Sequence, residues 1–153
     1  MTGVMGKYLR VNSKRLMRKR ITSVLGLAVI GLPAILVGGI FYYLLIGTFL
    51  VGAAREYVQL FQAVKYEPQL HITMGGVALI TFMRMFFPAY AQPAFAVSIL
   101  AAMAYHLVIY ERGRDQSALD FCITVGGLVY IGWIGSYLLD LRNLPNGGWW
   151  FML

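Results

Sequence analysis

The sequence ITSVLGLAVIGLPAILVGGIFYYLLIGTFLVGAA, from Ile21 to Ala54, runs for 34 residues without a charged side chain. It follows a leader that carries seven Lys and Arg among its 20 residues. A helix crosses the hydrocarbon core of a bilayer with about 20 residues, so this run is too long for one span and fits two short ones. Gly38 and Gly39 are the natural break, which predicts spans near 21–37 and 40–62. The protein is therefore predicted to lie in a membrane.

The composition supports the same class of protein. The chain is 59% hydrophobic and 12% charged, whereas about a quarter of the residues of soluble domains are charged. The net charge of +7 comes from the leader, because six basic residues balance six acidic ones in the rest of the chain. Beside a membrane span, such a leader favours the anionic inner leaflet over nucleic acid as a partner. The following apolar run is too long for a signal peptide, so the leader is interpreted as part of an uncleaved signal anchor.

Three further spans are predicted, near 72–87, 93–109 and 118–139. Pro88 and Pro93 are expected to mark the turn of a hairpin, since each lacks a backbone donor. Polar loops are expected at 65–71, 111–116 and 140–148, and Trp149 to Leu153 have the aromatic, interfacial composition of the start of a sixth span. The prediction is an all-α polytopic integral membrane protein with about five transmembrane helices, in two hairpins plus one. Residues 1–20 form a basic cytoplasmic leader and residues 21–153 the transmembrane domain.

The distribution of Lys and Arg predicts the orientation. The leader, the 62–71 loop and the 110–117 loop carry seven, one and two basic residues, whereas the loops at 38–39, 88–92 and 140–148 carry zero, zero and one. The positive-inside rule therefore places the amino terminus and the first group of loops in the cytoplasm.

A few polar residues in or beside the spans are candidates for a site. Arg55 and Glu56 either line a lipid or substrate cleft, or are an interfacial arginine that snorkels and a solvated neighbour, since adjacent residues of a helix do not face one another. Arg84 lies deeper in its span, where an ionisable group is a functional candidate, although snorkelling toward the nearby turn competes with that interpretation. Asp120 opens the fifth span, where an acidic residue offsets the helix dipole.

Other features argue for packing and against a visible active site. His71 and His106 lack a second ligand at i+3 or i+4, and Cys122 is the only cysteine, so the spacing indicates no metal site or disulfide. The chain has no phosphate-binding Gly-rich loop, no zinc-protease motif, no nucleophile elbow and no clustered carboxylates for Mg²⁺. Close helix packing is expected at three small-residue sites: Gly75-Gly76, Gly126-Gly127 and Gly132-x-x-x-Ser136.

The order of these pieces resembles the amino-terminal half of phosphatidate cytidylyltransferase, the CDP-diacylglycerol synthase family. The resemblance rests on four groups of residues: Lys19-Arg20-Ile21-Thr22-Ser23, Ala54-Arg55-Glu56-Tyr57, Gly127-Leu128-Val129-Tyr130-Ile131-Gly132, and Leu141-Arg142-x-Leu144-Pro145-x-Gly147 followed by Trp149-Trp150. It spans most of this chain but about the first half of the family's length. The expectation is therefore the amino-terminal part of a longer enzyme, inactive by itself.

The resemblance implies transfer of a cytidylyl group from CTP to phosphatidate, which gives CDP-diacylglycerol and pyrophosphate in the bacterial inner membrane. It also implies Mg²⁺, held in the family by acidic residues of the carboxyl-terminal half, and it leaves a homodimer open. No catalytic residue is carried over to this chain. The basic residues Arg18, Lys19, Arg20 and Arg55 are the candidates for binding the lipid head group, because they lie at the predicted cytoplasmic interface. The alternatives are a small non-enzymatic membrane scaffold and a transporter subunit, which would show paired intramembrane charges and interrupted helices in two repeats.

Overall fold

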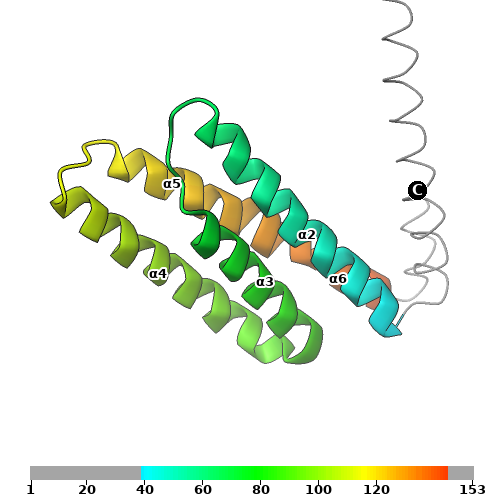
Figure 1. Ribbon diagram of the computed structural model, residues 1–153. Helices are drawn as coiled ribbons and strands as arrows, with labels where there is room; N and C mark the ends of the chain where they lie inside the picture. The colour runs from blue at the N-terminus through cyan, green and yellow to red at the C-terminus, as the bar shows by residue number, and fades with distance from the viewer. Residues whose placement is uncertain (1–38, 145–153) are drawn as a thin grey trace, which may run out of the picture. The chain divides into compact units, whose positions relative to one another are not determined.

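The structure, a computed structural model, describes residues 39–144, without the side chains of 142 and 143. The described part is helical and contains no strand (Figure 1). From Tyr43 onward the chain forms one compact unit, to which all but the first four residues of α2 belong. The helices follow in this order: α2 (Gly39–Gln62), α3 (Leu70–Phe86), the 3₁₀ turn η1 (Pro88–Tyr90), α4 (Ala91–Glu111), α5 (Ser117–Gly127), the π-helical segment η2 (Leu128–Ile134) and α6 (Gly135–Asn143).

The predicted spans within the described range are confirmed as helices. Three continuous helices are long and apolar enough to cross a membrane, at Gly39–Ala63, Pro88–Glu111 and Ser117–Leu141, and α3 is a shorter apolar helix. Gly39 begins α2 with a φ of +62°, in the left-handed region that glycine adopts without strain, which agrees with the predicted break before this helix. The leader, the span near 21–37 and the start of a sixth span lie outside the described residues.

Two predicted loops are wrong in their extent. The turn expected at 88–92 is helical, because η1 leads directly into α4, so that Pro93 lies in the first turn of α4. Proline is tolerated there, since the first helical turn has no intrahelical use for its N–H groups. The loop expected to begin at Asp140 begins later, because α6 continues to Asn143.

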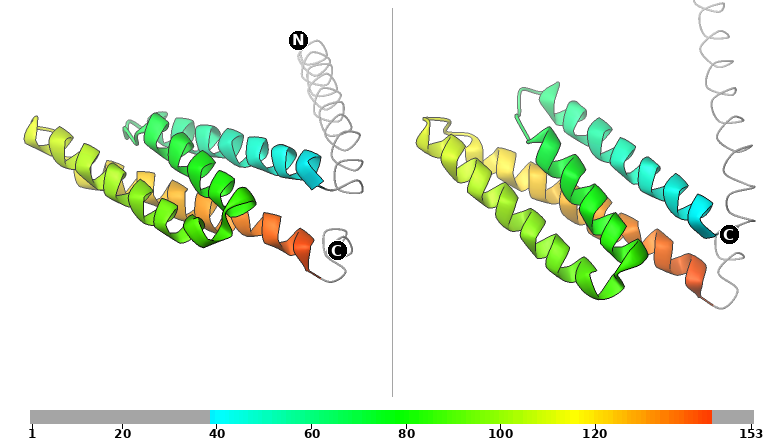
Figure 2. Two further views of the ribbon diagram at one scale, coloured as in Figure 1. Left: turned by 90° about the horizontal axis from the view of Figure 1, so that it is seen from below. Right: turned by 60° about the horizontal axis from the view of Figure 1, so that its bottom comes forward.

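Helices that follow one another in the chain run antiparallel, with α3 between α2 and α4 (Figures 1 and 2). The continuous rod formed by α5, η2 and α6 packs against α3 and α4, and it contacts α2 through Leu50 and Tyr57. We call the end where α2 and α4 finish and α3 and α5 begin the Asp120 end. The opposite end, where α3 finishes and α6 lies, is the Arg84 end. The core between them consists of small and aliphatic residues: Leu50, Ala54, Val77, Ile80, Ala102, Leu128 and Ile131.

Glycines let the rod approach its neighbours closely, as the small-residue pattern predicted. A Cβ atom on Gly127 would lie 2.9 Å from Cγ2 of Thr73, and one on Gly132 would lie 3.1 Å from Cδ1 of Ile80. A Cβ on Gly76 would collide with Leu128 and lie 3.1 Å from Cβ of Ser98. The expectation fails at Gly75, where a Cβ atom would meet nothing within 4 Å. In lipid the hydrophobic effect does not drive helices together, so the close packing that small residues allow is the basis of helix association in this bundle.

The neighbouring glycines of α3 provide a matched pair of substitutions. Gly76→Ala is expected to destabilise the protein by about 1–3 kcal/mol, because Leu128 and Ser98 must move to admit the methyl group. Gly75→Ala is expected to be neutral or to stabilise by up to about 1 kcal/mol, since alanine is the better helix former and the space is open. Reversible unfolding in mixed micelles would measure both variants. Equal effects would contradict this account of the packing.

The outward faces of the helices are apolar. Large hydrophobic side chains remain exposed on every long helix, among them Phe49, Phe82, Leu100, Leu107 and Tyr130. Soluble monomers seldom expose contiguous apolar surface on this scale. Together with the lengths of the helices, this surface indicates that the bundle is surrounded by lipid.

Candidate functional site

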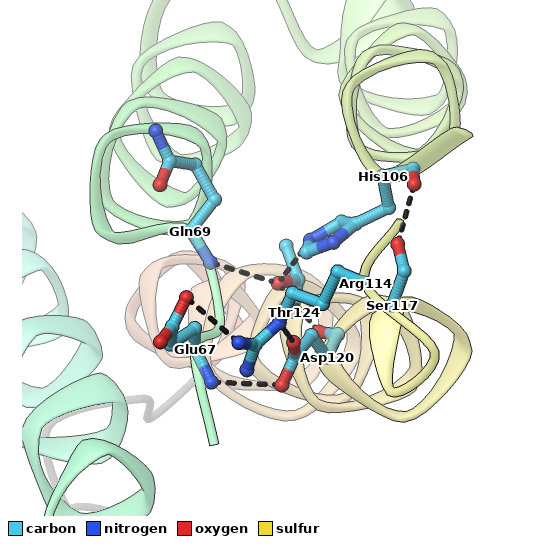
Figure 3. A network of polar contacts seen from close by, with 7 residues as sticks. All are labelled: Glu67, Gln69, His106, Arg114, Ser117, Asp120 and Thr124. Atoms are coloured by element: carbon cyan, nitrogen blue, oxygen red, sulfur yellow. Dashed lines mark hydrogen bonds and ion pairs between the residues drawn. The ribbon is translucent and has the colours of Figure 1, made fainter. Parts of the chain in front are cut away.

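A polar network at the Asp120 end is the best-defined group of interacting side chains in the described part (Figure 3). Its centre is Asp120, in the first turn of α5, whose side chain is 1% exposed. Oδ1 accepts a hydrogen bond of 2.7 Å from the backbone N–H of Glu67, and Oδ2 accepts one of 2.6 Å from Nε of Arg114. The carboxylate therefore exchanges its water for two strong donors, which a buried charge requires.

Arg114 joins the two loops at this end. Besides its bond to Asp120, its Nη1 lies 3.0 Å from Oε2 of Glu67, so that the guanidinium bridges the 112–116 connection and the segment before α3. The hydrogen bond to Asp120 is the main reason why the pKa of Arg114 is raised above its ordinary value. Arg114 is thus charged throughout the physiological pH range, so deprotonation of the arginine does not break its ion pair with Asp120 in that range.

Thr124, one turn after Asp120, is the second centre of the network. Its Oγ1 donates to the backbone carbonyl of Asp120 at 2.9 Å, which uses its one proton. The same oxygen accepts from the N–H of Gln69 at 3.2 Å and lies 3.1 Å from Nε2 of His106. Because the hydroxyl proton is already engaged, Nε2 must be the donor in the contact with His106. The proton of a neutral His106 is thereby assigned to Nε2, which leaves Nδ1 as a bare acceptor.

The network connects three helices and both loops. Ser117, the first residue of α5, donates to the backbone carbonyl of His106 on α4, while Gln69 and Glu67 fix the start of α3. Two buried nitrogens of this network have no partner among the described residues, Nδ1 of His106 and Nη2 of Arg114. The network holds backbone segments in position. The carboxylate of Asp120 already accepts hydrogen bonds from Arg114 and from the backbone N–H of Glu67.

The described residues do not fit a Mg²⁺ site. Within 39–144, no three His, Cys, Asp or Glu side chains are close enough together to hold a metal ion. Asp120 directs both oxygens at donors of the protein, and Asp140 pairs with Arg84. Since Mg²⁺ requires several oxygen ligands with near-octahedral geometry, neither carboxylate offers it a site in this arrangement.

A second polar cluster lies at the Arg84 end. Arg84, in the last turn of α3, has a side chain only 6% exposed, and its Nη1 lies 2.7 Å from Oδ2 of Asp140 on α6. The guanidinium carbon also lies 4.7 Å from the ring centroid of Trp133 and 3.8 Å from that of Tyr137. Cation–π contacts and an ion pair together compensate for the removal of this charge from water. The snorkelling interpretation of Arg84 is therefore wrong.

The π-helical segment supplies one of these aromatic rings. In η2 the N–H of Gly135 reaches the carbonyl of Tyr130, five residues back. Trp133 lies within this segment and also stacks on Phe95 of α4, with ring centroids 4.9 Å apart. Such single π-helical turns are frequent at functional sites, and here the turn brings a rod residue against both α3 and α4.

The residues predicted to bind the lipid head group are not part of this network. Arg18, Lys19 and Arg20 lie outside the described residues. Arg55 is exposed on α2, and neither it nor Glu56 forms an ion pair within residues 39–144. Asp120 is in the first turn of α5 as predicted, but its main role is to hold Arg114 and Glu67 together. The sequence signal for that role was an acidic residue at the edge of an apolar span, which requires a partner. His106 and Thr124 gave no such signal.

With this geometry described, the comparisons with known proteins give the family. A sequence model of the Cytidylyltransferase family matches residues 18–153. The chain belongs to the cytidylyltransferase family. The match includes both polar clusters and all the described helices. This cytidylyltransferase-family protein matches no curated protein, and no solved structure matches it either. Family membership indicates a nucleotidyltransferase, and the apolar helices associate it with a membrane.

Proposed function

We propose that this chain is the membrane part of a phosphatidate cytidylyltransferase, which forms CDP-diacylglycerol and pyrophosphate from CTP and phosphatidate. The observation that carries the proposal is the family match over residues 18–153 in a bundle with lipid-facing apolar helices. A soluble nucleotide and a membrane lipid must meet in this reaction. A nucleotidyltransferase embedded in the bilayer can receive a lipid phosphate directly from the side, without extracting it into water.

In this proposal the described bundle serves the lipid rather than the nucleotide. Its outward face is largely apolar, and its buried ion pairs lie in the two clusters. The bundle is proposed to form a wall past which phosphatidate moves, with Arg18, Lys19, Arg20 and Arg55 favouring the anionic head group. CTP and Mg²⁺ are proposed to be held by residues outside 39–144. When bound there, Mg²⁺ would supply positive charge to the phosphates in a reaction in which the lipid phosphate displaces pyrophosphate from the α-phosphorus.

The location proposed for this activity is a bacterial inner membrane, with the amino terminus and the Asp120 end on the cytoplasmic side. The excess of Lys and Arg in the leader and in the 62–71 and 110–117 loops supports that orientation. CTP is a cytoplasmic nucleotide, so the orientation also places the basic residues on the side where the reaction needs its phosphates.

Membranes from cells with and without the gene test the activity. They are incubated with Mg²⁺, phosphatidate and CTP labelled at the α-phosphate, and label in the lipid phase is measured. The proposal expects gene-dependent label in CDP-diacylglycerol that requires added phosphatidate. If the gene-dependent label instead appears with an isoprenyl phosphate and not with phosphatidate, the assigned acceptor is wrong, although nucleotidyl transfer stands.

Two structural features favour the alternative function of a transporter subunit. Arg84 and Asp140 are a paired charge within or at the edge of spans, and η2 interrupts the regular hydrogen bonding of the last rod. A transporter of the inverted-repeat type would show such features at matching positions of two halves. The ion pair and the π-helical segment lie on α3 and a single rod, without a matching second half, and the family match supports the transferase.

A further inference from the structure

A groove of about 320 Å³ lies between α2 and α3, and it opens on the lipid-facing surface of the bundle. Its lining is apolar apart from two threonines and a tyrosine, and the residues that matter below are Leu44, Gly47, Thr48 and Val51 of α2 and Thr81 and Phe82 of α3. Both helices are apolar and belong to the part of the protein expected in the hydrocarbon core.

The absence of a side chain at Gly47 contributes to the hollow. A Cβ atom at this position would lie 3.7 Å from Cγ2 of Thr81, an ordinary van der Waals contact. A larger side chain at position 47 would therefore extend into the groove. The hydroxyl of Thr81 donates to the carbonyl of Val77 at 2.7 Å and therefore requires no partner in the groove. A groove with this lining fits a hydrocarbon chain better than a polar ligand.

Arg55 continues the face of α2 that lines the groove. Relative to Leu44, positions 47, 48, 51 and 55 are spaced i+3, i+4, i+7 and i+11, so all of them lie on one side of the helix. Arg55 is exposed and forms no ion pair with any described residue. Glu56 projects about 100° away around the helix and does not face it. An exposed guanidinium toward the end of a membrane-spanning helix reaches the level of the lipid phosphates, which are anions that it can bind.

The distances fit one leaflet. Eleven residues separate Leu44 from Arg55, which corresponds to about 16 Å along the helix axis. Half of a hydrocarbon core of about 30 Å is about 15 Å. A lipid with its phosphate beside Arg55 would therefore extend an acyl chain along the whole groove, from the Asp120 end toward the middle of the membrane.

We propose that the groove between α2 and α3 is a docking site for phosphatidate, with one acyl chain against Gly47 and the phosphate beside Arg55. The inference rests on the proposed function in taking phosphatidate as the lipid. The charge of the site favours this choice, since a phosphate monoester carries up to two negative charges and a phosphodiester lipid carries one. The bundle would thereby concentrate the lipid substrate at its surface before the transfer reaction.

Photo-crosslinking of the full chain tests the site without CTP. The protein is reconstituted in phosphatidylcholine nanodiscs with phosphatidate that carries a diazirine in its acyl chain, and labelled peptides are identified by mass spectrometry. Label is expected in the groove segments of α2 and α3. Gly47→Leu is expected to remove most of it by filling the groove. The matched control is Gly52→Leu, on the same helix, where a Cβ would meet nothing within 4 Å and which does not line the groove.

Arg55→Gln tests the head group independently of the groove's shape. It is expected to lower labelling by phosphatidate about fivefold, whereas the same change at the exposed Arg112 is expected to leave it unchanged. Labelling that survives Gly47→Leu, or falls equally in Gly52→Leu, would overturn the site. Equal labelling by phosphatidylcholine or phosphatidylglycerol probes would overturn the choice of phosphatidate. Groove labelling without gene-dependent cytidylyl transfer would show that the proposed function fails while the lipid site stands.

Discussion

Asp140→Asn is expected to destabilise the protein by about 3 kcal/mol, the lower end of the range for breaking a buried ion pair, because Asp140 itself is half-exposed. The physical reason is the charge that remains. Arg84 is almost completely buried between Trp133 and Tyr137, and its Nε already lacks a partner among the described residues. Asparagine can still accept a hydrogen bond from Arg84 but carries no negative charge, so the guanidinium depends mainly on its contacts with the two rings, each of which contributes about 1–2 kcal/mol in a desolvated setting.

The reciprocal substitution is expected to cost less. In Arg84→Met the remaining Asp140 has a side chain that is 48% exposed, so it can be solvated where it stands. Methionine fills much of the volume between the rings and contacts them favourably through its sulfur. We therefore expect Arg84→Met to cost about half as much as Asp140→Asn, and the double variant to cost little more than Arg84→Met alone.

Unfolding of the four proteins in mixed micelles, followed by Trp fluorescence, gives this double-mutant cycle. An equal cost for both single variants with no coupling would show that Arg84 and Asp140 do not depend on one another. Such a result would also contradict the position of α6, whose last turns the ion pair holds against α3.

Asp120→Asn is expected to destabilise the protein by about 3 kcal/mol. Asparagine can still accept the hydrogen bond from the N–H of Glu67, but it offers no negative charge to Arg114. The expected cost is at the lower end of the range for buried pairs, because the side chain of Arg114 is 27% exposed and can turn toward water. The start of α3 and the 112–116 connection should loosen together, since Arg114 and Asp120 join them.

Asp115→Asn is the matched control for this variant. Asp115 lies in the same connection and is exposed, so the same change there is expected to alter stability by no more than about 0.5 kcal/mol. Hydrogen exchange of the 63–70 and 112–118 segments measures the local effect beside the global unfolding free energy. Faster exchange at only one of the two segments would contradict the bridging role of Arg114.

The helices themselves could be predicted well from the sequence. Long runs without charge, separated by short polar connections, predicted the positions of α2, α3, α4 and the α5–α6 rod to within a few residues. The errors occurred at residues 88–92 and at Asp140, which were assigned to loops. Proline in a first helical turn and an acidic residue near a helix end are both also typical of loops, so local composition did not distinguish the alternatives.

The polar clusters could be predicted only in part. The cost of an ionisable residue in an apolar run marked Arg84 as a candidate, whereas Asp120 was predicted only to offset the helix dipole. Neither signal identified a partner, because Arg84 and Asp140 are 56 residues apart and the packing of α3 against α6 brings them together. The contact of His106 with Thr124 likewise joins α4 to α5 across 18 residues.

What the sequence by itself determined is the membrane class, the helical architecture and the resemblance to the family that the match over residues 18–153 confirms. These follow from length, apolarity and local motifs, each of which is read within a single segment. Only the tertiary structure decided that Asp120 organises two loops, that Arg84 is paired, and that Gly76 is in close contact while Gly75 is open. The physical reason is that partners and clearances depend on which faces of different helices meet, and the pattern within one helix does not fix its neighbour's rotation or height.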